Sequence, residues 1–221
     1  MELLIREKLK MKKWLKNVSF MILLLKSCIL LGQEFDAKKI IVIDPGHGGN
    51  DLGAIGVNQT EEKTITLQIS RLISELAEKN HDQTVEIYQT RYSDTLISLR
   101  DRARMAIALN ADLYLSLHCN HSDNPNARGV EVYVSSQRSK FLDESTWLAF
   151  QLQADLNEKL GFESRGVKFA NFQVLRETTD FMPSVLLELG FLSNKDESHY
   201  ISGYENLKHI ALAILSLLKI P

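Results

Sequence analysis

Apolar runs alternate along the chain with segments whose apolar positions recur at helical spacing. The runs at 40–44, 112–117 and 184–187 are rich in isoleucine, leucine and valine, which is typical of strands buried on both faces. The segment 61–79 repeats apolar residues at i, i+3 and i+4, which predicts an amphipathic helix. Further strands are expected at 84–90, 129–134 and 172–176, and further helices at 98–110, 144–160 and 204–219. This alternation predicts a single α/β domain with a mainly parallel, partly mixed sheet flanked by helices on both faces.

Two finer expectations concern how these elements begin and pair. Thr60 is the candidate N-cap of the helix at 61–79, because a threonine oxygen accepts a hydrogen bond from a free N–H of the first turn. The strand at 129–134 follows its predecessor closely, so we expect it to pair antiparallel at an edge of the sheet.

The first 32 residues read as an export segment. Three lysines between residues 12 and 16 precede a mostly apolar stretch at 20–31, which is the layout of a signal peptide. Lys26 interrupts the apolar stretch, so no full membrane span is expected. We expect 1–32 to be a signal peptide or N-terminal anchor, and 33–221 to be an exported domain in the periplasm or at the cell wall. A start at Met11, or a lipid on Cys28, stays open.

Charge and cysteine content narrow the possible partners. The chain has 26 basic and 28 acidic residues, and seven of the basic residues lie within 1–32. The remainder has 19 basic and 26 acidic residues, and an acidic body argues against nucleic-acid binding. After removal of 1–32 the one cysteine is Cys119, so no internal disulfide is expected.

Candidate chemistry gathers where three predicted strands end. His47 follows the first strand in a glycine-rich turn, His118 ends the second strand, and Glu188 ends the third. Sites in open α/β sheets form at the carboxyl ends of strands, so these side chains are expected at one edge. Two histidines and a carboxylate are ligands that zinc prefers, and Glu61 or Glu62 in the next helix is within reach as a third ligand.

Each residue also has an ordinary structural explanation. His47 would be incidental in a surface turn, His118 a hydrogen-bonded core histidine, and the glutamates at 61 and 62 would complement the helix dipole. Neighbouring residues on a strand point to opposite faces, so Cys119 is not expected to bind the same metal ion as His118. We interpret Cys119 as a small packing residue. Glu188 lies in an apolar strand, where a carboxylate is unfavourable unless it is paired or functional.

The motifs taken together are more specific than any one of them. Their order along the chain is Asp-Pro-Gly-His-Gly-Gly at 44–49, Glu-Lys at 62–63, Ser-Leu-His-Cys-Asn at 116–120, Gly-Val-Glu-Val-Tyr at 129–133 and Leu-Glu-Leu-Gly-Phe-Leu-Ser-Asn at 187–194. This series resembles the zinc-dependent N-acetylmuramoyl-L-alanine amidases of the Amidase_3 family across about residues 39–218. Cys119 stands where the family usually has a smaller residue.

The resemblance implies a role for individual residues. It implies zinc bound by His47, Glu62 and His118, which selects Glu62 over its neighbour, and Glu188 as the catalytic base and acid. Asn120 and Arg176 are candidate substrate contacts at strand ends. Arg91 and Arg102 also match family positions, and a structural ion-pair role is an equal alternative for both.

The implied activity is hydrolysis of the amide between N-acetylmuramic acid and L-alanine in peptidoglycan. We expect a monomer that acts on peptidoglycan, with a role such as cell separation, recycling or lysis. The link at 135–143 is short, so we expect no inhibitory helix over the site and no need for an activator. The alternatives are an enzyme that hydrolyses another amide and a wall-binding module without catalysis. A zinc protease is disfavoured because the sequence has no His-Glu-x-x-His motif.

Overall fold

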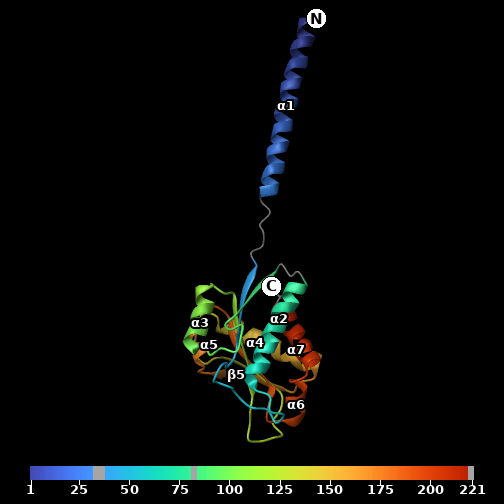
Figure 1. The fold of residues 1–221 in the computed structure, drawn as a ribbon. Coiled ribbons are helices and arrows are strands. Elements are labelled where there is room, and N and C mark those ends of the chain that lie inside the picture. The colour runs from blue at the N-terminus through green and yellow to red at the C-terminus, as the bar shows by residue number, and fades with distance from the viewer. Residues whose placement is uncertain (32–37, 81–83, 219–221) are drawn as a thin grey trace. The chain divides into compact units, whose positions relative to one another are not determined.

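A six-stranded sheet forms the centre of residues 38–221, the larger of two units into which the chain divides (Figure 1). The computed structural model describes residues 1–31, 38–80 and 84–218. In chain order the larger unit contains β1 (Lys39–Pro45), α2 (Glu62–Lys79), β2 (Val85–Gln89), α3 (Leu99–Ala108), β3 (Leu113–Asn120), β4 (Val130–Ser135), α4 (Leu142–Leu160), β5 (Ser164–Ala170), α5 (Gln173–Thr178), β6 (Ser184–Phe191), α6 (Lys195–Tyr200) and α7 (Tyr204–Leu218).

In the smaller unit, residues 1–37, the described part contains the helix α1 (Glu2–Leu31). Within the described part of the chain, no helix combines the length and the apolar character that crossing a bilayer requires. The expected signal-peptide boundary at residue 32 lies outside the described residues, so the export segment stays a prediction.

The strands lie in the order β2-β1-β3-β6-β4-β5. The first four are parallel to one another, while β4 is antiparallel to β6 and β5 is parallel to β4. The expected mainly parallel, partly mixed sheet is therefore confirmed. The segment 129–134 does pair antiparallel, as expected, but β5 lies outside it and forms the edge.

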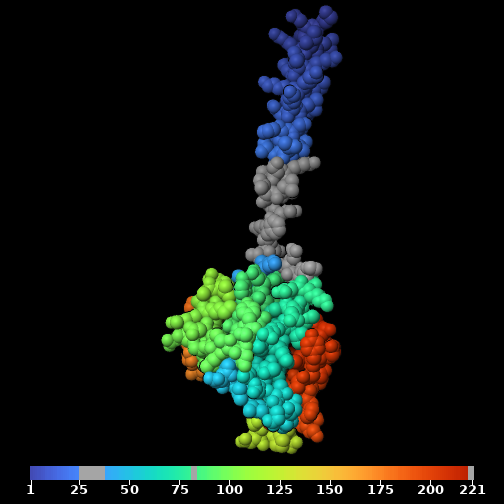
Figure 2. All heavy atoms as spheres, viewed as in Figure 1, coloured from blue at the N-terminus to red at the C-terminus, as the bar shows by residue number. Residues whose placement is uncertain are grey.

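Both faces of the sheet are covered because successive strand residues point to opposite sides. In β1, Ile41 and Ile43 belong to a large core cluster, whereas Val42 between them belongs to a smaller cluster on the other face. The large cluster is shared with α2, α4 and α7, and α2 and α7 lie side by side (Figure 2). The smaller cluster is shared with α3 and α5.

Two local predictions are wrong. Phe172 to Arg176 is not a strand: Phe172 is the N-cap of α5, and Val174 and Leu175 pack into the smaller core cluster. Thr60 is not the N-cap of α2, because the helix begins one residue later, at Glu62. The free N–H groups of Glu62 and Lys63 donate instead to the backbone carbonyls of Ala54 and Leu52, at 2.9 and 3.2 Å.

Candidate metal centre and active site

The loop after β1 places His47 over the carboxyl edge of the sheet. Asp44, the buried carboxylate before it, accepts hydrogen bonds from Thr90, Tyr114, Ser116 and Arg102. The guanidinium of Arg102 also donates to the carbonyls of Pro45 and His47, at 2.7 and 2.6 Å. These contacts hold the loop in the conformation that aims His47 at the site.

Gly46 and Gly53 let the loop approach two side chains outside it closely, one on β3 and one on α2. A Cβ on Gly46 would lie 2.4 Å from the ring of His118, and a Cβ on Gly53 would lie 2.5 Å from Glu62 Oε2. His47 itself has a φ of 61°, in the left-handed region that residues with a side chain rarely occupy. Such strain is typical of functional sites, where the surrounding contacts over-determine the backbone.

Glu62 reaches the site from the first turn of α2, and its carboxylate is bound on both oxygens. Oε2 accepts from the N–H of Ala54 at 2.8 Å, and Oε1 accepts from the N–H of Cys119 at 2.9 Å. Glu61 turns outward and lies 3.5 Å from the ammonium of Lys63. These contacts favour Glu62 over Glu61 as the candidate third ligand, a choice that the spacing in the sequence left open.

Three side chains converge on one point. Glu62 Oε1 lies 3.1 Å from His47 Nε2 and 2.9 Å from His118 Nδ1. The two imidazole rings meet edge to face, with centroids 4.9 Å apart. Each residue offers one ligand atom, and the three atoms lie within 4.8 Å of one another. Among the described residues, this is the one group of three histidine, cysteine or acidic side chains placed to hold a metal ion.

Asp51 was missed by the sequence analysis and orients His47. Its Oδ2 lies 2.9 Å from His47 Nδ1, so the other ring nitrogen faces Glu62. Burial lowers the pKa of His47, but the hydrogen bonds and charges of Glu62 and Asp51 outweigh burial and raise that pKa to about 9. Carboxylates behind ligand histidines are a recurrent feature of metal sites, so an acid four residues after His47 was the available signal.

Glu188 lies beside this group without a partner. It is opposite His118 in the register of β3 and β6. Its Oε2 is the one buried side-chain nitrogen or oxygen that lacks a hydrogen bond among the residues described here. Burial, with the nearby negative charges of Glu62 and Glu131, raises the pKa of Glu188 to about 7. A carboxyl group with this pKa can both accept and donate a proton at neutral pH.

A cavity of about 730 Å³ opens onto these groups. Its walls come from the β1 loop, the segment before α3, and the start of α5. The lining residues are Asp44, Gly46, His47, Asp51, Leu96, Ile97, Ser98, Leu99, Asp101, Arg102, His118, Phe172, Gln173, Val174, Leu186 and Glu188. The cavity thus brings a substrate-sized space against the candidate base and both histidines.

The two candidate substrate contacts lie outside the lining of this cavity. Asn120 ends β3 and donates to Glu131 Oε2 at 3.1 Å. Arg176 is on α5 rather than at a strand end, and it donates to Asn171 Oδ1 at 2.8 Å. A substrate role for either residue stays a prediction.

The two arginines bind backbone carbonyls and a buried carboxylate, and Cys119 packs in the core. Arg91 donates to the carbonyls of Pro45 and Gly46, and Arg102 pairs with Asp44 at 2.7 Å in the interior. Cys119 is buried in the large core cluster. These contacts favour the structural alternative for both arginines.

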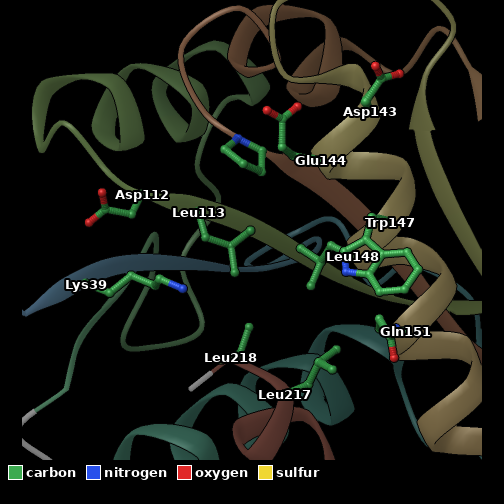
Figure 3. Close-up of a pocket in the computed structure, with 11 residues that line it drawn as sticks. Lys39, Asp112, Leu113, Asp143, Glu144, Trp147, Leu148, Gln151, Leu217 and Leu218 are labelled. Carbon is green, nitrogen blue, oxygen red and sulfur yellow. The ribbon is translucent and has the colours of Figure 1, made fainter. Parts of the chain in front are cut away.

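A second pocket, of about 610 Å³, lies at the opposite, amino edge of the sheet (Figure 3). Lys39 and Leu113, which begin β1 and β3, form one wall, and α4 and α7 contribute Trp147 and Leu217. The lining combines apolar side chains with Lys39 and with the carboxylates of Asp112, Asp143 and Glu144. Neither histidine of the candidate metal site lines this pocket.

Comparison with known proteins agrees with this geometry. The Amidase_3 family, described as N-acetylmuramoyl-L-alanine amidase, matches residues 41–219. The chain is 34% identical over 183 residues to a probable cell wall amidase, LytH, of Staphylococcus epidermidis, which covers 82% of this chain and 57% of that protein. It is 37% identical over 158 residues to the N-acetylmuramoyl-L-alanine amidase LytC of Bacillus subtilis, covering 72% of this chain and 30% of that protein. The chain thus spans little more than half of the first of these relatives, and less of the second.

Solved structures resemble the larger unit. The catalytic domain of the amidase CwlV from Bacillus (Paenibacillus) polymyxa var. colistinus has a TM-score of 0.73 and 31% identity, covering 81% of this chain and 96% of that one. An N-acetylmuramoyl-L-alanine amidase from Clostridium difficile has a TM-score of 0.75 and 33% identity, covering 82% and 95%. On the family match, the identities and the shared fold, the chain belongs to the Amidase_3 family of N-acetylmuramoyl-L-alanine amidases.

Proposed function

We propose that this protein is a zinc-dependent N-acetylmuramoyl-L-alanine amidase that releases stem peptides from peptidoglycan. One observation carries the proposal: Glu188, whose buried Oε2 has no hydrogen-bond partner, lines the same cavity as His47 and His118, which converge with Glu62. Membership of the family and the similarity to named cell wall amidases support the same substrate.

The donor set fits zinc. Two imidazole nitrogens and one carboxylate oxygen make the three-ligand set of catalytic zinc sites, in which the fourth position stays open. The ligand atoms already lie within 4.8 Å of one another, and glycine at 46 and 53 keeps Cβ atoms away from the rings and the carboxylate. His47, Glu62 and His118 would hold the ion, with Asp51 fixing the orientation of His47. When bound, zinc supplies Lewis-acid chemistry, polarising a carbonyl oxygen and lowering the pKa of water.

In the proposed mechanism, Glu188 transfers the same proton in two steps. Its carboxylate accepts a proton from the attacking water as the new C–O bond forms at the scissile carbonyl. It returns that proton to the amide nitrogen as the C–N bond breaks, so the peptide leaves with a free amino group. The pKa of about 7, raised mainly by burial, suits both transfers.

We further propose that the protein acts outside the cytoplasm, since several relatives are named as probable cell wall amidases. The basic, partly apolar segment 1–32 supports export as a signal peptide or anchor. Activity without an activator is expected, because the link between β4 and α4 is only residues 136–141 and contributes nothing to the cavity lining.

The variant Glu188→Gln tests the assignment of the base, and Glu61→Gln is the matched control. Glu188→Gln should bind one zinc per chain, as judged by metal analysis, and should lose more than about 99% of turnover, since general acid–base catalysis contributes about 10²–10⁴-fold. Glu61→Gln should keep both properties, because Glu61 faces Lys63. Full turnover by Glu188→Gln would remove Glu188 from the mechanism.

A further inference from the structure

Ionisable side chains continue across the sheet from the metal centre. His118 on β3 is opposite Glu188 on β6, and Glu188 is opposite Glu131 on β4. Directly opposed residues in neighbouring strands project from the same face of a sheet. The three side chains therefore form a row along the carboxyl edge, of which the proposed mechanism uses only the first two.

Two cations on the edge strand β5 complete this row. Arg165 Nε and Lys168 Nζ each lie 2.6 Å from Glu131 Oε1. The side chain of Glu131 is almost fully buried, at 4% exposed, whereas the side chains of Arg165 and Lys168 are 33% and 37% exposed. A buried carboxylate thus fixes two cations whose charged groups still reach solvent.

Arg165 and Lys168 keep unused hydrogen-bond donors and a net positive charge after their contact with Glu131. Glu131 supplies one negative charge against two positive ones, and its Oε2 is taken by Asn120 and by the hydroxyl of Tyr133. Arg165 uses Nε and Nη1 in the hydrogen bonds of the described residues, which leaves Nη2 for another acceptor. Lys168 uses one of its three ammonium hydrogens on Glu131. The pair is therefore arranged to receive an anion.

Aromatic contacts connect the pair to the cavity. Phe172 lines the cavity and packs edge to face on Tyr133, with ring centroids 5.2 Å apart. Lys168 Nζ lies 5.9 Å from the centroid of the Tyr133 ring. A lysine that only protects an edge strand from pairing would extend into solvent. Lys168 instead bends back to the buried Glu131, beside the cavity wall.

We propose that Arg165 and Lys168 form a subsite for a free carboxylate on the second or third residue of the stem peptide. This inference rests on the proposed amidase function. Both cations contact Glu131, which is directly opposite Glu188 on the neighbouring strand, so their charged groups lie about one strand spacing, roughly 5 Å, to the side of Glu188, plus the length of the contact with Glu131. An extended peptide covers about 3.4 Å per residue, so the second and third residues both come within reach of the pair.

Stem peptides offer carboxylates of this kind in two places. The second residue, a glutamate linked through its side chain, has a free α-carboxylate unless it is amidated. The third residue has a side-chain carboxylate when it is diaminopimelate and none when it is lysine. A contact with the third residue would show as a preference for diaminopimelate over lysine, and a contact with the second residue would show as sensitivity to its amidation.

The test measures kcat and KM of the full chain on soluble muramyl tripeptides. Three substrates are compared: diaminopimelate third, lysine third, and diaminopimelate third with the second residue amidated. Relative to the substrate that lacks the recognised carboxylate, the double variant Arg165→Gln/Lys168→Gln should raise KM about tenfold for the substrates that carry it, the loss expected for one charge-assisted hydrogen bond. Any change in kcat that reaches Glu188 through the unpaired Glu131 should be the same for all three substrates. The single variant Lys168→Arg keeps the charge and should keep the preference.

Lys208→Gln is the matched control, because Lys208 is a partly exposed, ion-paired lysine on α7, which packs on the other face of the sheet. It should leave all three KM values unchanged. Equal KM values for wild type on all three substrates, or equal effects of the double variant on all three, would overturn the subsite.

Calorimetric binding of the free tripeptides separates the subsite from the amidase function. Tighter binding of the tripeptide that carries the recognised carboxylate, lost in the double variant, supports the subsite whether or not a substrate is cleaved. Absence of cleavage would refute the amidase function instead. Cleavage without any discrimination refutes the subsite alone. Binding that follows inorganic phosphate or a phosphate polymer, and not the peptide carboxylate, also overturns it.

Discussion

Replacing Arg102 with leucine should destabilise the domain strongly, because it breaks a buried ion pair that holds the His47 loop. Arg102 is 2% exposed and Asp44 is 1% exposed, and their charged groups are 2.7 Å apart. Burial raises the pKa of Asp44, but Arg102 and the hydroxyl donors hold it below its usual value. Arg102→Leu leaves that carboxylate charged and buried without a counter-ion, and it frees two carbonyls of the loop.

The magnitude follows from the burial of both partners. Breaking a buried pair by removing one partner costs about 3–5 kcal/mol, since the remaining charge is uncompensated. In a domain of this size, each kcal/mol lowers Tm by about 2–4 °C, so Arg102→Leu should lower Tm by about 10 °C. Thermal unfolding followed by circular dichroism, with urea unfolding for the free energy, measures both quantities.

Arg104 provides the matched control on the same helix. Its side chain is 68% exposed and its nearest carboxylate, on Asp101, is 3.9 Å away, so Arg104→Leu should change stability by less than about 0.5 kcal/mol. Equal losses in the two variants, or a loss below about 1 kcal/mol for Arg102→Leu, would refute the reasoning that burial makes this pair structural.

Three further predictions test other parts of the account. Burial raises the pKa of Glu131, but hydrogen bonds from two cations and a tyrosine lower it to about 2. The contribution of the ionised Glu131 to the free energy of unfolding is thus fully present above about pH 4.5 and is lost as the pH falls through about 2. The free energies of unfolding of wild type and Glu131→Gln should therefore converge in acid. Parallel curves of this free energy against pH would contradict the prediction. Ser98 caps α3 by accepting from the N–H of Asp101, and Ser98→Ala should cost about 1 kcal/mol in urea unfolding, with no loss speaking against the cap. Gly53→Ala should weaken zinc binding at least about tenfold by calorimetry, because its Cβ would displace Glu62; unchanged affinity would show that the loop adapts.

The strands and their terminal residues were predictable because each signal is local. Buried parallel strands are short runs of β-branched and leucine residues, and the side chain that follows such a run lies at the carboxyl edge. His47, His118 and Glu188 were therefore placed at one edge from the sequence alone. The sheet order brings their strands together, with β3 between β1 and β6.

A choice between Glu61 and Glu62 as the proposed third ligand requires the start of α2 to within one residue. Neighbouring helical residues differ by about 100° in direction, so a one-residue error exchanges Glu61 for Glu62. The predicted cap at Thr60 was wrong because backbone carbonyls from the preceding loop satisfy the first N–H groups. That loop reaches the start of the helix only in the folded structure, and the hydrophobic periodicity of the sequence carries no information about this contact.

The edge of the sheet was the least predictable part. The true strand β5 has the sequence Ser-Arg-Gly-Val-Lys-Phe-Ala and is mostly exposed or half-buried, so it has little apolar signal. The segment 172–176 has a stronger apolar signal, but Val174 and Leu175 bury it as a helix against Val42 and Tyr114. The contact of Glu131 with Arg165 and Lys168 depends on this edge strand, so it was also missed.

The central claim is that zinc held by His47, Glu62 and His118 supports cleavage at the lactyl–alanine amide. The most direct measurement incubates the purified full chain with isolated peptidoglycan, with a chelator, and with zinc restored after chelation, and it identifies products by mass spectrometry. The account predicts stem peptides with a free L-alanine amino group, absent under the chelator and recovered with zinc. One zinc bound per chain without this product, or the same product undiminished by the chelator, would contradict it.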